Sequence, residues 1–145
     1  MKLSLVTSSF NSEATIRATL DSVRAQEYLP FEYIVIDGGS TDGTLKILEE
    51  YSDVITKIVS EPDDGIYDAL NKGIAQSTGD VVGFLHSDDL FASPKALRHV
   101  MNTFEESDAD IVYADLDYVK REDSSIVTRK WRSRVFKKEL FYKGW

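Results

Sequence analysis

The sequence predicts an α/β fold: a doubly wound, mainly parallel β-sheet with helices on both faces. Short runs of β-branched and aromatic residues recur along the chain, as is typical of strands buried on both faces. Between these runs, apolar residues recur at the 3.6-residue spacing of helices. Strands that alternate with helices imply right-handed crossovers between parallel strands. The length of 145 residues suits a single domain with a real buried core.

Each expected element follows from its own residues. The five expected strands are residues 3–7 (LSLVT), 33–37 (YIVID), 55–60 (ITKIVS), 80–86 (DVVGFLH) and 110–116 (DIVYADL). The four expected helices carry apolar stripes formed by Ile16, Leu20 and Val23; by Leu45, Leu48 and Tyr51; by Ile66, Ala69, Leu70, Gly73 and Ile74; and by Leu97, Val100, Met101 and Phe104. Candidate caps precede three of them, namely Asn11 and Ser12, then Asp42, then Ser93 with Pro94.

Composition predicts a soluble, cytoplasmic protein. No apolar run approaches the roughly 20 residues that span a bilayer. The N-terminal stretch MKLSLVTSSFNSE turns polar too soon for the core of a signal peptide. The chain has no cysteine, so it forms neither a disulfide framework nor a thiolate metal site.

The charges are distributed unevenly. Residues 1–127 hold 10 Lys and Arg against 24 Asp and Glu, a net charge of −14, whereas residues 128–145 carry +6. An acidic body argues against nucleic acid as a partner, because nucleic-acid binding needs a basic face. The tail mixes its cations with aromatic residues, namely Trp131, Phe136, Phe141, Tyr142 and Trp145. It suits an anionic membrane surface or a phosphate; the alternative is a terminal strand and helix belonging to a longer protein.

Polar residues follow each of the first four expected strands. In a doubly wound sheet the ligand binds outside the carboxyl ends of the strands. The segments TSSFN, DGGSTDGT, EPDDG and HSDD bring Ser8, Asn11, Asp37, Asp42, Asp64, Asp88 and Asp89 to that edge. Singly, each has an ordinary explanation: Asp42 as a helix cap, the glycines and PDDG as turns. Together they indicate a site, because converging carboxylates repel unless a cation or ligand offsets them.

Asp88 and Asp89 are adjacent carboxylates at the end of an apolar strand. Mg²⁺ and Mn²⁺ favour such oxygen ligands and commonly combine one or two carboxylates with water and substrate phosphates. The pair therefore predicts a phosphate-bridging metal site. His86 is either a further ligand or a packed residue of the strand. The chain has no G-x-G-x-x-G fingerprint and no P-loop.

Three segments carry a family resemblance. LVTSSFNSEATIRATLDSVRAQ, YIVIDGGSTDGTLKIL and SEPDDGIYDALNKGIAQSTGDVVGFLHSDD stand in the order and at the intervals of a family-two glycosyltransferase. Nearly all of the chain resembles the N-terminal, nucleotide-binding part of such an enzyme, which implies the Rossmann-like GT-A fold. EPDDGIYDALNKGI is similar in particular to enzymes that build bacterial surface polysaccharides and lipopolysaccharide.

The resemblance implies roles for individual residues. Thr7 and Ser8 would lie at the nucleotide, with Asn11 in the same loop. Asp37 and Asp64 would bond the base, and Lys72 would lie near the base or the phosphates. Asp88 would hold the ribose and contribute to the metal site. Asp89 would bind the Mg²⁺ or Mn²⁺ on the diphosphate.

This chain departs from the family pattern in two places. Ser87 stands where many members have the first aspartate of Asp-x-Asp. Members also normally continue beyond the point where this sequence stops, into an acceptor-binding half that carries the general base. Residues 1–90 would then be the nucleotide-binding half and residues 91–145 the start of the acceptor half of one domain. The base is expected downstream of Trp145, with Asp115 and Asp117 as weaker candidates.

The implied reaction is inverting transfer from a nucleotide-diphosphate sugar, with UDP as the first expectation, to a glycan or lipid-linked acceptor. Two alternatives remain open. One is a catalytically silent module that binds nucleotide sugars. The other is a sugar nucleotidyltransferase, which would need a Gly-rich, basic loop after the first strand, where TSSFNSEAT stands. Self-association and peripheral contact with the inner face of the membrane complete the expected partners.

Overall fold

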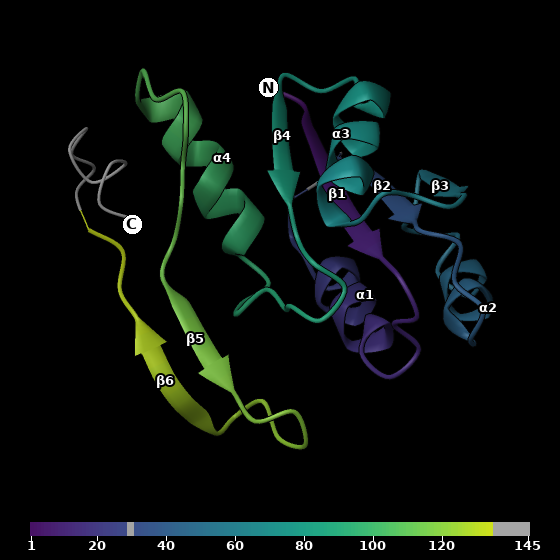
Figure 1. Cartoon of the computed structure of the whole chain (residues 1–145). Coiled ribbons are helices and arrows are strands. Elements are labelled where there is room, and N and C mark those ends of the chain that lie inside the picture. Colours follow the sequence, from purple (N-terminus) through teal and green to yellow (C-terminus); the bar gives the residue numbers. More distant parts are fainter. Residues whose placement is uncertain (29–30, 135–145) are drawn as a thin grey trace. The chain divides into compact units, whose positions relative to one another are not determined.

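The computed structural model describes residues 1–28 and 31–134. Contacts divide the chain into an N-terminal unit, Met1–Ser107, and a C-terminal unit, Asp108–Trp145. In chain order the N-terminal unit contains β1 (Leu3–Ser9), α1 (Ile16–Arg24), β2 (Phe31–Asp37), α2 (Thr44–Glu49), β3 (Lys57–Ser60), α3 (Ile66–Gln76), β4 (Val81–Phe84) and α4 (Ala96–Glu106) (Figure 1). The ends of its four strands lie within two residues of their predicted positions.

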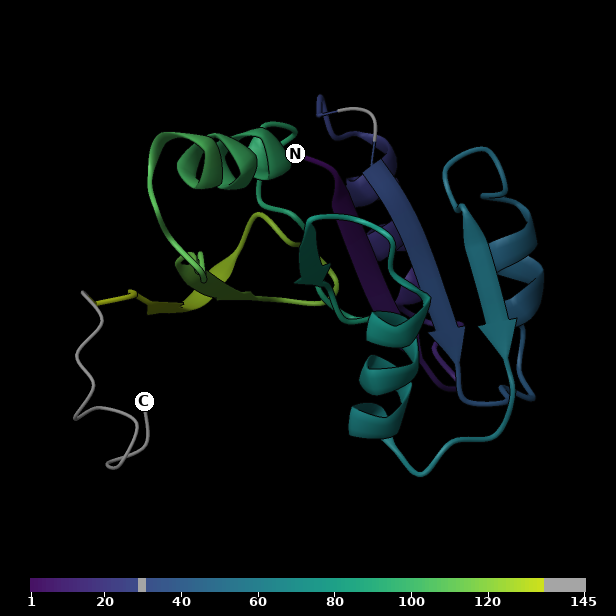
Figure 2. The same ribbon diagram turned by 90° about the horizontal axis from the view of Figure 1, so that it is seen from above.

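The strands of the N-terminal unit form a parallel sheet in the order β3-β2-β1-β4. Figure 2 shows β1, β2 and β3 side by side, with their arrowheads toward one end. The chain proceeds outward from β1 to β3 and then returns to place β4 on the other side of β1. The order of the strands therefore reverses at β1 and β4, which is where doubly wound sheets bind their ligands.

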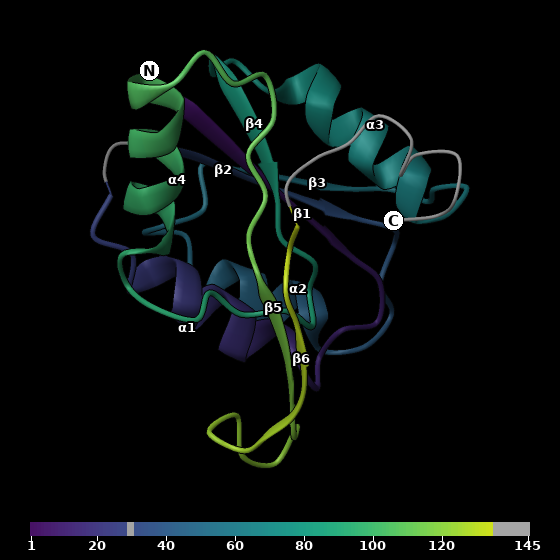
Figure 3. The ribbon, with the colours of Figure 1, turned by 90° about the vertical axis from the view of Figure 1, so that its left-hand side faces the viewer.

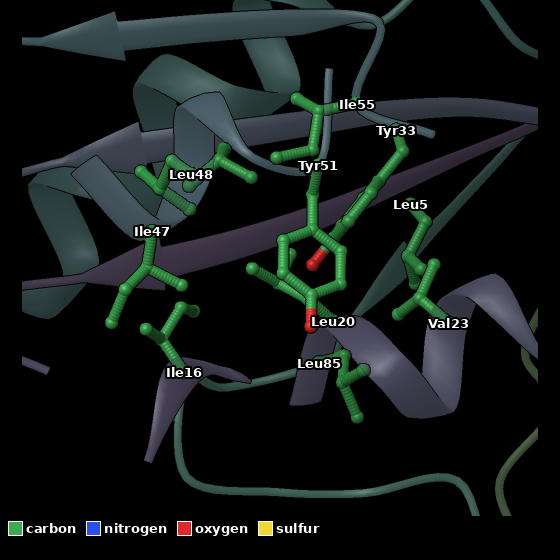
Figure 4. Close-up of a cluster of buried hydrophobic side chains, with 11 residues drawn as sticks. Leu5, Ile16, Leu20, Val23, Tyr33, Ile47, Leu48, Tyr51, Ile55 and Leu85 are labelled. Carbon is green, nitrogen blue, oxygen red and sulfur yellow. The ribbon is translucent and has the colours of Figure 1, made fainter. Parts of the chain in front are cut away.

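Alternating residues of the strands pack against helices on opposite faces. On one face Leu5 and Tyr33 contact α1 and α2 through residues such as Leu20 and Leu48, all fully or almost fully buried (Figure 4). The other face packs against α3, seen on the opposite side of the strands from α1 and α2 in Figure 3. Each such apolar side chain contributes roughly 1.5–3 kcal/mol on burial. The predicted arrangement of helices on both faces is confirmed.

The observed caps differ in part from the candidates. Neither Asn11 nor Ser12 caps α1 with its side chain; instead the carbonyl of Ser12 accepts the N–H groups of residues 15 and 16. Asp42 does act at the start of α2, where its Oδ1 accepts the Thr44 N–H at 3.0 Å. Ser93 precedes α4, and its Oγ accepts the N–H of residue 95 at 3.2 Å.

The C-terminal unit contains an antiparallel hairpin of β5 (Leu116–Val119) and β6 (Val127–Trp131). The predicted strand at 110–116 is wrong: the strand starts at Leu116, and its partner is β6 rather than a strand of the parallel sheet. Apolar alternation predicts which residues could share a face, but a strand forms only where its backbone finds a partner. Ile111, which the pattern placed in a buried strand, is 73% exposed.

No helix within residues 1–28 and 31–134 is long and apolar enough to span a bilayer.

Candidate functional site

The end of β1 is held from both sides by side-chain contacts. Thr7 Oγ1 lies 2.9 Å from the Tyr33 hydroxyl, and both residues are fully buried. Burial raises the pKa of Tyr33 to about 12, so its hydroxyl stays protonated at neutral pH. Ser8 Oγ lies 3.4 Å from His86 Nδ1, which connects the ends of β1 and β4. Thr7 thus belongs to the core beneath the predicted site, whereas Ser8 reaches its edge.

Asp37, the last residue of β2, is fully buried and accepts five hydrogen bonds. Its carboxylate accepts the hydroxyls of Ser9, Ser40 and Ser60 at 3.1, 2.5 and 2.8 Å. It also accepts the backbone N–H groups of Gly39 and Ser40 at 3.1 and 2.9 Å. A carboxylate offers about four lone-pair sites, so these five donors saturate it. In this arrangement Asp37 fixes the ends of β1, β2 and β3 and has no acceptor to spare for a base.

The loops after β1 and β2 are joined by reciprocal hydrogen bonds. Asn11 Oδ1 accepts the Thr41 N–H at 2.9 Å, and Asn11 itself has a φ of +47°. Glu13 donates its N–H to Asp42 at 3.1 Å, and its side chain accepts the Gly43 N–H at 3.0 Å. Asn11 therefore holds the neighbouring loop, and these hydrogen bonds organise this edge of the site.

Asp42 also helps to join the loop after β1 to the loop after β2, because its carboxylate accepts the N–H groups of Glu13 and Thr44. Hydrogen bonds lower its pKa, first from the Thr44 hydroxyl and then from the N–H groups of Thr44 and Glu13. Its carboxylate accepts the N–H of Thr44, the first residue of α2, although the N-cap position itself is Gly43.

The loop after β3 brings Asp63 rather than Asp64 toward the end of β2. Asp64 is exposed, and its N–H donates to Asp68 Oδ2 at 3.2 Å. The carboxylate of Asp63 lies over Gly38: a Cβ added to Gly38 would sit 2.7 Å from Asp63 Oδ2. Asp63 Oδ1 accepts the Gly65 N–H at 2.9 Å, while Oδ2 accepts no hydrogen bond from any described residue.

Sequence reasoning missed Asp63. The signal was the glycine that follows Asp37: a position without a side chain leaves room for one delivered by another loop. The same loop turns at Gly65, whose φ of +98° would strain any other residue. Lys72 of α3 contacts Glu61 and the Pro62 carbonyl in this loop, and Asp68 in the first turn of its own helix.

Asp88 and Asp89 lie exposed in the loop after β4. The Asp89 N–H donates to the His86 carbonyl at 3.0 Å, which fixes the turn. Partial burial of its carboxyl, and then the charge of Asp88, raise the pKa of Asp89, with His86 acting in the opposite direction. Residues 1–28 and 31–134 contain no cluster of three His, Asp or Glu side chains able to hold a metal. Two adjacent carboxylates do fit an ion that takes its other ligands from phosphate and water.

Asp115 and Asp117 are engaged within the C-terminal unit. Arg132 pairs with Asp117 Oδ1 at 2.7 Å and with Asp115 Oδ2 at 3.5 Å. The backbone N–H and hydroxyl of Ser133, followed by Arg132, lower the pKa of Asp115. A lowered pKa makes a carboxylate a weaker base, so these contacts argue against Asp115 as the catalytic base.

Phe10 is a second residue that sequence reasoning missed. It directly follows β1 and is 62% exposed, although a phenylalanine gains by burial. An exposed aromatic ring beside organised polar loops suits stacking against a flat ligand ring. The signal in the sequence was the single aromatic residue inside the polar segment TSSFN.

Comparison with known families decides the class of protein. Residues 4–144 match the model of Glycosyl transferase family 2. The chain belongs to this family. This family-2 chain is 46% identical over 100 residues to an uncharacterized glycosyltransferase of Mycobacterium tuberculosis, covering 68% of this chain and 38% of the relative. It is 34% identical over 117 residues to a PGL/p-HBAD biosynthesis glycosyltransferase of Mycobacterium bovis, covering 78% and 46%. It therefore spans less than half the length of these relatives.

Solved structures confirm the GT-A fold of this family-2 chain. Staphylococcus aureus TarS in complex with UDP-GlcNAc has a TM-score of 0.70 and 30% identity, over 76% of this chain and 33% of TarS. Glucosyl-3-phosphoglycerate synthase from Mycobacterium tuberculosis, in complex with Mn²⁺, UDP and glucosyl-3-phosphoglycerate, has a TM-score of 0.59 and 29% identity, over 71% and 39%. Mannosyltransferase PcManGT from Pyrobaculum calidifontis is 24% identical with a TM-score of 0.66, over 81% and 35%, and supports the fold alone.

Proposed function

We propose that this chain is the donor-binding part of a transferase that moves a sugar, with inversion, from a UDP-sugar to a glycan or lipid-linked acceptor. The observation that carries the proposal is the organised set of polar side chains at the carboxyl ends of four parallel strands. Membership of the family supports it, as do TarS with UDP-GlcNAc and glucosyl-3-phosphoglycerate synthase with UDP. A role in bacterial polysaccharide biosynthesis and transfer of a hexosyl or N-acetylhexosaminyl group belong to the same proposal.

The nucleoside is bound by residues from two loops. Asp63 Oδ2, which accepts no bond from the described residues, would accept the imide N–H of uracil. Phe10 offers its exposed ring to the face of the base. Asp37 and Asn11 act indirectly, because their hydrogen bonds hold the loops that carry these groups.

The diphosphate end is assigned to Asp88 and Asp89. Asp88 would accept hydroxyl groups of the ribose, and both carboxylates would hold Mg²⁺ or Mn²⁺. When bound, the ion would neutralise charge that develops on the departing diphosphate. The general base that takes a proton from the acceptor hydroxyl is not assigned to a described residue.

A catalytically silent binding module is the second candidate, favoured by the pairing of both Asp115 and Asp117 with Arg132. Donor binding without sugar transfer or hydrolysis would favour it.

Membrane contact and self-association are further proposals for the C-terminal unit. Leu116, Tyr118 and Val127 are each more than 40% exposed, and Arg129 and Lys130 lie in the same hairpin. Such a mixture suits an anionic membrane at the inner, cytoplasmic face, which cosedimentation with anionic vesicles would test, or a second copy, which sedimentation velocity would test. Phe136, Phe141, Tyr142 and Trp145, named in the sequence-based prediction, lie outside the described residues.

UDP is expected to raise the melting temperature of the chain, and Mn²⁺ or Mg²⁺ to enlarge the rise. A ligand at a hundred times its Kd adds about 2.7 kcal/mol of apparent stability. A thermal-shift titration with UDP, GDP and dTDP, with and without the metal, measures this. UMP is the control, because it lacks the diphosphate that the metal would bridge. A melting temperature that no nucleotide diphosphate changes, with either metal, contradicts the proposed function.

Asp89→Asn is expected to remove the effect of metal on UDP binding without destabilising the free chain. The folded-state pKa of Asp89 is raised, so its ionised form opposes folding. The free-energy cost of ionising Asp89 in the folded chain is absent below pH 3.8, its ordinary pKa, and complete above its raised folded-state pKa. At neutral pH the uncharged amide of the variant therefore removes this cost. Melting curves across pH and UDP titrations with and without Mn²⁺ measure the two effects. Asp88→Asn, the matched variant, should weaken UDP binding in both conditions; identical behaviour of the two variants would refute the assigned roles.

A further inference from the structure

We infer that Lys72 is a positioning residue that clamps residues 61–65, the loop between β3 and α3, and that it does not bind the nucleotide phosphates directly. The inference rests on the proposed function for its ligand, because the loop carries Asp63. Lys72 lies on the second turn of α3, and the loop joins β3 to α3 (Figure 2).

The contacts of Lys72 account for all of its hydrogen-bonding capacity. Its Nζ lies 3.0 Å from Glu61 Oε1, 3.0 Å from the Pro62 carbonyl oxygen and 3.2 Å from Asp68 Oδ2. An ammonium group has three N–H donors and no acceptor, so three acceptors saturate it. The side chain is 25% exposed, which makes it the more buried partner in both ion pairs. The hydrogen bonds that Lys72 donates, first to Glu61 and also to Asp68, raise its pKa, whereas burial lowers it.

These contacts fix the loop on both sides of Asp63. Lys72 holds residues 61 and 62 immediately before Asp63. Asp68, held by Lys72, accepts the Asp64 N–H immediately after it. The clamp therefore connects the two flanks of Asp63 to one helix. Gly65, with its φ of +98° and no atom within 4 Å of an added Cβ, has little packing of its own to hold the turn.

The neighbours of Lys72 also distinguish a clamp from a phosphate ligand. A lysine that binds phosphate works best where nearby carboxylates do not compete for its charge. Here two carboxylates compete, so removing either would free Lys72 for phosphate if that were its role. If Lys72 is a clamp, removing either carboxylate loosens the loop instead. The two roles thus predict opposite changes in UDP affinity when Glu61 or Asp68 loses its charge: an increase if Lys72 binds phosphate, and a decrease if Lys72 is a clamp.

The test compares nucleotide affinities of the full 145-residue chain and its variants by calorimetry. Lys72→Met is expected to weaken uridine, UMP and UDP alike, each about fivefold, because partly exposed ion pairs are individually weak. Glu61→Gln and Asp68→Asn are expected to weaken UDP in the same direction, and Lys72→Arg to recover part of the loss. Lys46→Met, an exposed lysine on α2, is the control for removal of one positive charge.

Two results of the binding measurements would overturn the inference. One is a loss in Lys72→Met that is confined to UDP while uridine binds normally; the other is tighter UDP binding in Glu61→Gln or Asp68→Asn. Amide hydrogen exchange of residues 61–68 without nucleotide gives an independent readout, and Lys72→Met should speed it whereas Lys46→Met should not. Unchanged exchange refutes the clamp even if the variants bind weakly. Failure of the unsubstituted chain to bind any nucleotide, with loop exchange faster in Lys72→Met, would refute the proposed function and leave the clamp standing.

Discussion

Asp37→Ala is expected to destabilise the chain by about 3–5 kcal/mol, because each donor that loses its buried acceptor costs about 1–3 kcal/mol. The substitution leaves the N–H groups of Gly39 and Ser40 without their acceptor and opens a cavity where the carboxylate was. Since small domains are stable by only about 5–15 kcal/mol, much of the margin would be lost. Urea denaturation followed by circular dichroism measures the change.

Asp37→Asn separates charge from geometry at the same position. An asparagine oxygen placed at the Oδ2 site can still accept the two backbone N–H groups. Its amide can donate to the hydroxyls of Ser9 and Ser40, which rotate to accept. We therefore expect a loss of about 1–2 kcal/mol, because hydrogen bonds to a charged acceptor are stronger than neutral ones. Equal stability of Asp37→Ala and the unsubstituted chain would show that Asp37 does not organise the strand ends.

The parallel sheet could be predicted because its signals are local. The runs that became β1 and β2 are short and rich in β-branched and aliphatic residues, as is typical of doubly covered strands, and the stripe Ile16, Leu20 and Val23 has helical spacing. The strand expected at 110–116 failed for a non-local reason. Its apolar alternation resembles that of β1, but its pairing depends on which other segment offers a free backbone edge, and here the hairpin begins only at Leu116.

The sequence predicts which residues follow the strands better than it predicts their hydrogen bonds. Strand ends must gather at one edge, so Asp37 and the Asp88–Asp89 pair could be placed there from their positions in the sequence. The sequence does not predict which carboxylate keeps an oxygen free to accept a hydrogen bond from a ligand, because that depends on donors supplied by other loops. Three serines and two backbone amides saturate Asp37. Of two adjacent aspartates in PDDG, the turn at Gly65 sends Asp63 over Gly38 and leaves Asp64 exposed.

Gly73→Val is expected to destabilise the chain by about 3 kcal/mol, at the upper end of what overpacking a core usually costs. In most helices, replacing glycine by a residue with a side chain is favourable or neutral, because glycine loses the most backbone entropy on folding. Gly73 is different because α3 approaches β1 at this position. A Cβ added to Gly73 would clash with Cγ1 of Val6, a fully buried residue at the centre of the sheet. The added side chain therefore forces the helix away from the strand.

The double substitution tests that cause. Val6→Ala removes the methyl group that the new side chain would strike, so Gly73→Val with Val6→Ala should be more stable than the sum of the single changes allows. Asn71→Val, on the exposed side of α3, controls for placing a valine in this helix where no strand lies close, and should change stability by only a few tenths of a kcal/mol, because asparagine and valine have similar helix propensities. Urea denaturation of the unsubstituted chain, the two single variants and the double variant gives the coupling energy. Additive costs for Gly73 and Val6 would mean that the two residues do not meet, and the close approach of α3 to β1 would then have to be abandoned as the reason for glycine at this position.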